Sequence, residues 1–143
     1  MAIAVSGGST SFTSTFTASP TANRAITVPD ASFTLAGTDA AQTFSSAQRG
    51  TVTTDNDGSF DQSVTNNFKC TPTGTFTLTF TNHTAGQSGY VLLVNTSGYA
   101  ISAAATTKLG ASTLATISTA GTYILAYFDD GTNAYVTASG ALS

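Results

Sequence analysis

The stretch TFTLTFT, residues 75–81, alternates apolar and hydroxyl-bearing side chains along its whole length. Successive side chains of a β-strand point to opposite faces, so Phe76, Leu78 and Phe80 share one face and the threonines share the other. This alternation is typical of a strand that buries one face, and nowhere else in the sequence is it clearer. The stretch therefore predicts a strand that lines the core of a β-rich domain.

Patterns of the same kind on both sides of this stretch predict further strands. Upstream, SFDQSVTNNFKC (59–70) carries all of its apolar residues at even positions, namely Phe60, Val64, Phe68 and Cys70. Downstream, YVLLVN (90–95) is apolar on both faces, which is typical of a central strand. Asp130-Gly131 is a strong signal for a two-residue hairpin. Further strands are predicted at SGYAIS (97–102), STLATIS (112–118), TYILAYF (122–128) and AYVTA (134–138).

The number and spacing of these segments predict the fold class. Seven or eight strands at intervals of roughly ten residues are typical of sandwiches, jelly rolls and small barrels. Ser, Thr and Gly are abundant and form helices poorly, so we expect almost no helix. We predict an all-β domain, built as an antiparallel sandwich or jelly roll. Its predicted core is Phe68, Phe76, Leu78, Phe80, Val91, Leu93, Ile124 and Phe128.

The composition argues against two classes of partner. Charged residues make up only 8% of the 143-residue chain, and the formal net charge is −3. No basic patch is available to neutralise a phosphate backbone, so we expect no nucleic-acid binding. The longest apolar run, residues 90–94, is far shorter than a membrane helix, so we expect no membrane insertion. The first eight residues, MAIAVSGG, carry no Lys or Arg and do not resemble a secretory signal.

The N-terminal part has a different texture, and we place a domain boundary between residues 1–48 and 49–143. Within TANRAITVPDASFTLAG (21–37), two short alternating runs meet at Pro29-Asp30 and read as two strands. An isolated pair of strands this short is only marginally stable in water. The segment is therefore flexible, or ordered by its own domain, by other copies of the chain, or by a larger surface. We favour an extended segment that is ordered by its neighbours.

The carboxylates of this sequence fit turns better than metal or catalytic sites. A calcium loop with Gly58 at its sixth position would begin at Thr53 and end at Val64, so both essential acids are missing. Asp and Gly readily adopt turn conformations, and we interpret TVTTDNDGSFDQS (51–63) as a polar turn. Asp129 and Asp130 are interpreted as hairpin residues in the same way. The carboxylates of residues 51–63 belong to Asp55, Asp57 and Asp61.

Two single residues of chemical interest also favour structural interpretations. His83 is the sole histidine, and no Gly-x-Ser-x-Gly or similar nucleophile elbow accompanies it, so we expect a surface loop residue. Cys70 ends a strand pattern on its apolar face, so we expect a small buried side chain and no reactive thiol. We predict no catalytic residue, no metal ligand and no cofactor. The five tyrosines leave core packing and sugar stacking both open: Tyr90, Tyr99, Tyr123, Tyr127 and Tyr135.

The runs TNNFKCTPTGTFTLTFTNHTAGQSGYVLLVN (65–95) and STAGTYILAYFDDGTNAYVTASGALS (118–143) resemble the C-terminal module of structural proteins of tailed bacteriophages, particularly phages of marine bacteria. The AGQSG turn and the final hairpin carry this resemblance, which extends over about residues 53–143. Residues 21–37 also resemble an element of phage fibres in which three chains wrap around one axis. The resemblance implies a non-enzymatic, all-β, trimeric protein displayed on the virion surface.

We therefore expect a virion structural protein that assembles in the bacterial cytoplasm as a homotrimer and contacts other proteins of the capsid or tail lattice. A capsid decoration or head-fibre protein is favoured, because about 48 residues before the β-module leave no room for a fibre shaft. The alternative is a small tail-fibre or tail-tip protein that binds host surface glycans. A free carbohydrate-binding module and a hydrolase are further, weaker alternatives.

Overall fold

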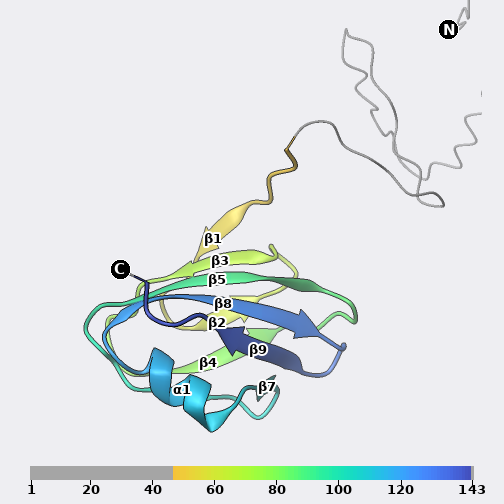
Figure 1. Cartoon of the computed structure of the whole chain (residues 1–143). Helices are drawn as coiled ribbons and strands as arrows, with labels where there is room; N and C mark the ends of the chain where they lie inside the picture. The colour runs from red at the N-terminus through yellow and green to blue at the C-terminus, as the bar shows by residue number, and fades with distance from the viewer. Residues whose placement is uncertain (1–46, 143) are drawn as a thin grey trace, which may run out of the picture. The chain divides into compact units, whose positions relative to one another are not determined.

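A computed structural model of the chain describes residues 47–142, which contain nine strands and one short helix (Figure 1). The predicted N-terminal segment, residues 1–48, lies almost entirely outside the described residues. The two alternating runs at Pro29-Asp30 lie outside them as well, so the expectation that neighbours order them stays a prediction. Within the described residues, no helix is long and apolar enough to cross a membrane.

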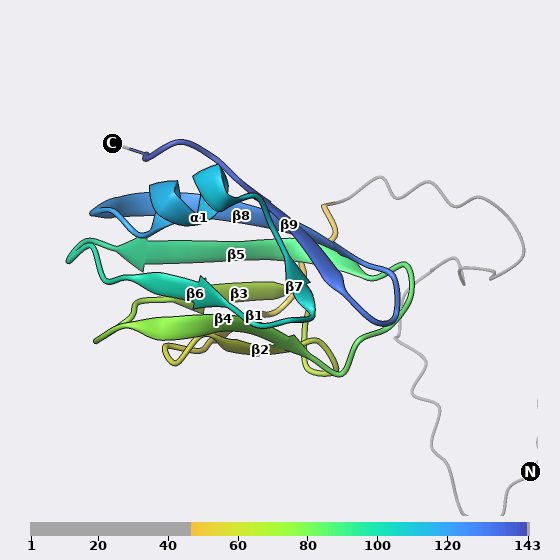
Figure 2. The same ribbon diagram turned by 90° about the horizontal axis from the view of Figure 1, so that it is seen from below.

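The nine strands form two sheets. The large sheet has the order β1-β3-β5-β8-β9-β7, and the small sheet has the order β2-β4-β6. The strands of the large sheet are β1 (Val52–Thr54), β3 (Asn67–Cys70), β5 (Ser88–Asn95), β7 (Thr107–Lys108), β8 (Gly121–Asp129) and β9 (Ala134–Ala138). Those of the small sheet are β2 (Ser59–Asp61), β4 (Phe76–Thr81) and β6 (Ile101–Ala103). In the view from below in Figure 2, the helix α1 (Ala111–Ile117) lies beyond β6, at one end of the small sheet. The helix contacts β6 and β9.

The first six strands are stacked as in a solenoid. The chain alternates between the two sheets from β1 to β6, so that β1, β3 and β5 pair in parallel, as do β2, β4 and β6. The β8–β9 hairpin then joins β5 in antiparallel orientation, and β7 pairs in parallel with β9. The all-β prediction is confirmed and the jelly roll is not. Antiparallel pairing is wrong for five of the seven strand pairs, because alternation shows which face is buried but not the direction of the neighbouring strand.

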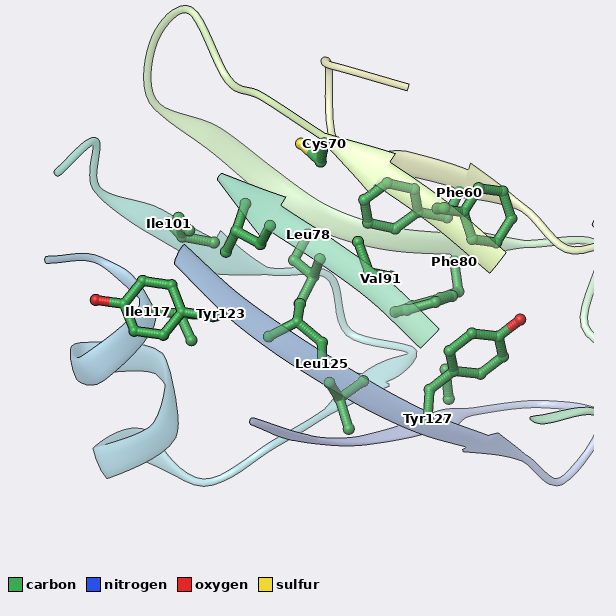
Figure 3. Close-up of a cluster of buried hydrophobic side chains, with 14 residues drawn as sticks. Phe60, Cys70, Leu78, Phe80, Val91, Ile101, Ile117, Tyr123, Leu125 and Tyr127 are labelled. Atoms are coloured by element: carbon green, nitrogen blue, oxygen red, sulfur yellow. The ribbon is translucent and has the colours of Figure 1, made fainter. Parts of the chain in front are cut away.

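The core lies between the two sheets (Figure 3). Five of the predicted core residues are buried: Phe68, Leu78, Phe80, Val91 and Leu93. Phe76 is only partly buried against this core. The prediction is wrong for Ile124 and Phe128, which are 40% and 52% exposed. β8 is apolar on both faces, and the core takes Tyr123, Leu125 and Tyr127 instead.

The prediction of a strand at residues 112–118 is wrong, because these residues form most of α1. Leu114 and Ile117 are three residues apart and share one face of a helix. Ile117 is fully buried and Leu114 packs partly against the same core. The segment thus covers the inner side of the large sheet where the small sheet ends. With seven residues it is the single helix of the described part of the chain, in line with the low helix content expected.

Asn95, at the end of β5, joins three parts of the chain inside the protein. It is fully buried, and its amide nitrogen donates hydrogen bonds to the carbonyl oxygens of Tyr99 and Ile117, each at 2.9 Å. Its amide oxygen accepts one from the Tyr99 N–H, also at 2.9 Å. One side chain thus fixes the turn after β5 and the end of α1. Its role was not foreseen, because the sequence shows Asn95 only as the last residue of the predicted strand YVLLVN, and its partners lie outside that strand.

We expect Asn95→Ala to destabilise the protein by about 3 kcal/mol, because the substitution leaves buried backbone groups without partners. Urea unfolding followed by circular dichroism measures the change. The neighbouring Thr96→Ala variant, at an exposed position in the turn after β5, serves as a control and should cost less than about 1 kcal/mol. Equal losses in the two variants would contradict the role assigned to Asn95.

Candidate functional site

The most unusual surface of the described residues is the outward side of the large sheet, here called the outer face. Seven large apolar side chains between residues 47 and 142 are clearly exposed. Val64 lies in the connection between β2 and β3, and the other six belong to the large sheet or its C-terminal continuation. These six are Val52, Tyr90, Ile124, Phe128, Tyr135 and Leu142.

The strand register makes most of these side chains neighbours. Phe128 of β8 stands directly opposite Tyr135 of β9. Ile124 stands opposite the partly buried Leu92 of β5, and Tyr90 stands opposite Ala126. Tyr90 and Phe128 are then diagonal neighbours, which aromatic side chains can bridge. The outer face therefore carries one continuous apolar patch over β5, β8 and β9, with Val52 and Leu142 near its margins.

Charge is nearly absent from this patch. The strand register places Lys69 and Lys108 on the outer face, beside Leu92 and Tyr135 respectively. No acidic side chain stands between the apolar ones. Asp130, in the hairpin turn at the margin, accepts a hydrogen bond of 3.0 Å from the Tyr135 hydroxyl, which fixes that ring and raises the pKa of Tyr135. An extended apolar patch with little charge is typical of a surface that contacts another molecule.

The tyrosines thus divide into two groups. Tyr123 and Tyr127 are core residues, and Tyr99 is half-buried in the turn after β5. Tyr90 and Tyr135 lie on the outer face and are about half exposed. Core packing therefore accounts for two of the five residues, and only two present an open ring to a partner.

A polar cluster lies at the end of β8. Asp129 belongs to the β8–β9 hairpin, as expected, and it is fully buried there. His83 lies in the loop after β4, as expected, but its side chain is only 17% exposed, and its Nδ1 lies 2.6 Å from Asp129 Oδ2. The same oxygen accepts a 2.9 Å hydrogen bond from the Gln62 amide, and Asp129 Oδ1 accepts one of 2.7 Å from the Gly131 N–H.

This cluster connects three loops. Gln62 follows β2, His83 follows β4, and Gly131 belongs to the β8–β9 hairpin, where it adopts a φ of +92°. Burial raises the pKa of Asp129, but the hydrogen bonds from His83, Gln62 and Gly131 outweigh it, so this pKa lies below its ordinary value. Within the described residues, no hydroxyl or thiol is hydrogen-bonded to His83. The cluster of Gln62, His83, Asp129 and Gly131 therefore holds three loops together, and it is called the clip below.

Three further acidic residues of the described part of the chain accept hydrogen bonds in turns. Asp55 accepts a hydrogen bond from the Asp57 N–H, and Asp57 accepts one from the Ser59 N–H. Asp61 accepts bonds from Ser63 and from the Asn82 amide. The expected polar turn is thus found at residues 55–58, but the interpretation is wrong for much of the rest of residues 51–63, because Val52–Thr54 and Ser59–Asp61 form β1 and β2. Among residues 47–142, no group of three or more His, Cys, Asp or Glu side chains could hold a metal ion.

Gly58 explains the tightness of the first of these turns. Its φ is +83°, and an added Cβ would lie 2.1 Å from Cδ2 of Phe76. Only glycine fits both the left-handed backbone and the close approach of the ring. The residue at the centre of the apparent calcium-loop pattern is thus explained by packing.

Cys70 is buried, as predicted. Burial raises the pKa of its thiol to about 12, and the negative charges of Asp55 and Asp57 add to the shift. The thiol therefore stays protonated at neutral pH, and the thiolate is the form that reacts.

No protein-family model, no curated protein and no solved structure matches this chain.

We expect Asp129→Asn to destabilise the protein by about 2 kcal/mol at pH 7, because the clip loses its charge-assisted hydrogen bonds. The folded-state pKa of Asp129 is lowered, so its contribution is present above the unfolded value of about 3.9 and is lost as the pH falls through the folded value. Urea unfolding at pH 7 and pH 3 should show that the variant loses less stability than the wild type on acidification. Asp130→Asn, an exposed neighbour, is the matched control and should have a smaller effect at pH 7.

We expect Cys70 in the folded protein to resist modification by iodoacetamide at pH 7.5, and to react when urea unfolds the chain. Mass spectrometry of the intact protein measures the modified fraction over time. Rapid and complete labelling under native conditions would contradict the burial of this side chain.

Proposed function

We propose that this chain is a non-enzymatic structural protein of a tailed-phage virion, which assembles as a homotrimer on the virion surface. The single observation that supports this best is the outer face, an apolar and nearly uncharged patch that suits contact with protein. The resemblance of residues 65–95 and 118–143 to phage structural modules points in the same direction. The remaining polar groups discussed above serve turns and the clip, which is consistent with a protein that acts by binding.

Residues 1–48 are the proposed attachment and trimerisation segment. Their two alternating runs need a partner to bury one face, as argued from the sequence. We favour a capsid decoration or head-fibre protein over a tail fibre, because such a segment can attach to a protein lattice. Arms that are poor in charge and rich in Thr can also add strands to exposed sheet edges of a protein lattice.

One feature favours the alternative of a glycan-binding tail-tip protein. A shallow hollow beside the exposed Tyr90 ring is lined by the side chains of Asn66, Asn67 and Ser88, together with Gly89 and Tyr127. A ring flanked by amide and hydroxyl groups offers stacking and hydrogen bonds of the kind that sugars use. The larger apolar patch around this hollow leads us to rank protein contact first.

The copy number of the chain in purified phage particles tests this proposal. We expect hundreds of copies per particle if the protein covers a capsid lattice, as measured by quantitative mass spectrometry against a major capsid protein standard. A few dozen copies or fewer, together with inhibition of adsorption to host cells by the purified chain, would favour the tail-tip alternative. Absence from the particles would contradict both.

Deletion of residues 1–45 tests the role of the N-terminal segment. We expect the shortened chain to keep the circular dichroism spectrum of a β-protein and to assemble less strongly than the full chain. Native mass spectrometry measures the assembly state at matched concentrations. Unchanged assembly after the deletion would show that this segment is not needed for trimer formation.

A further inference from the structure

The outer face carries an apolar patch that reaches the size at which such patches are often functional. Three of its side chains, Tyr90, Phe128 and Tyr135, are each about half exposed. At roughly 200 Å² per aromatic side chain, they alone expose about 300 Å² of mainly apolar area. That is already near the lower limit for the largest apolar patch of a typical monomer, and such patches are often functional.

The apolar area of the outer face approaches what a stable association between chains needs. A standard interface buries about 800 Å² on each partner, and roughly 65% of a homodimer interface is apolar, which gives about 500 Å². Ile124, Leu92 and Ala126 extend the aromatic patch along β5 and β8 toward this value. Small sugars contact a much smaller surface, so a glycan would leave most of the patch uncovered.

The charge pattern indicates what kind of partner fits. The described acidic residues lie in turns, on β2 of the small sheet, or buried at the end of β8, and none stands within the patch. The patch over β5, β8 and β9 therefore carries no charge of its own, and the two lysines of the outer face flank it on opposite sides, Lys69 on β3 and Lys108 on β7. An apolar surface without such a pattern is compatible with a copy of itself, and most soluble oligomers are homo-oligomers.

We propose that the outer face is the surface through which copies of this chain associate, with the apolar side chains of β5, β8 and β9 packing against those of the other copies. The number of copies, three, rests on the proposed function above. The small sheet then faces away from the contact, because its outward side chains are mostly hydroxyls, such as Thr77, Thr79 and Ser102.

A pair of cysteine variants of the full-length chain tests the position of the contact. Thr137 is exposed on the outer face, directly opposite Ala126, and Thr77 is exposed on the outward side of the small sheet. We expect Thr137→Cys to be cross-linked between chains by a short bis-maleimide at least tenfold faster than the matched control Thr77→Cys. Wild-type protein, with its buried Cys70, supplies the background rate.

A charge substitution tests whether the patch drives the association. We expect Ile124→Lys to weaken association of the full-length chain tenfold or more, because association would bury an unpaired charge. Thr79→Lys on the small sheet should leave the association constant within a factor of two. Light scattering over a dilution series measures it, and protection of Cys70 from iodoacetamide verifies that each variant is folded.

The outcomes separate this inference from the proposed function. A wild-type oligomer that persists in Ile124→Lys, with no preferential cross-link at position 137, would overturn the inference and leave the virion assignment intact. A monomeric wild-type chain found in phage particles would also overturn it, and would mean that another virion protein covers the face. If the chain associates through the outer face but is absent from phage particles, the inference is supported and the virion assignment is contradicted.

Discussion

A line of aromatic rings across the core sets the orientation of the strands around it. Phe60 of the small sheet lies 5.0 Å from Phe68 of the large sheet and 5.5 Å from Phe80, measured between ring centroids. Phe80 in turn lies 4.7 Å from Tyr127 of β8. Because Tyr127 must point inward to complete this line, the alternate residues of β8 must point outward. The outward orientation of Ile124 and Phe128 is therefore a direct consequence of how β8 packs in the core.

The strength of a sequence pattern determined how well each element could be predicted. Strict alternation located β4, and the turn signal at Asp130-Gly131 located the β8–β9 hairpin. Where both faces are apolar, as in β8, alternation carries no information about which side is buried. Parallel stacking was also hidden, because the partner and direction of a strand depend on contacts between distant residues. Residues 112–118 were mistaken for a strand because Thr and Ile favour strands in general.

The candidate site was predictable only in part, for related reasons. The tyrosines could be recognised as ambiguous, but their division into core and surface depends on the register of β5, β8 and β9. The contact between His83 and Asp129 joins residues 46 positions apart, and no local motif announces it. Cys70 and the turn carboxylates were interpreted correctly because local rules decide them. Contacts between distant loops, such as the clip at Asp129, need the fold itself.

The hydroxyl-bearing side of the small sheet has a consequence for any assembly in which it faces the medium. Thr77 and Ser102 hydrogen-bond each other at 2.8 Å, and Asp61 is the sole charged residue of the three described strands of this sheet. If copies associate through the outer face as proposed, this side would present a hydrated surface of low charge. Ionic strength screens interactions between charges and has little to act on here. Such a surface would keep its adhesive properties nearly constant between dilute and concentrated salt.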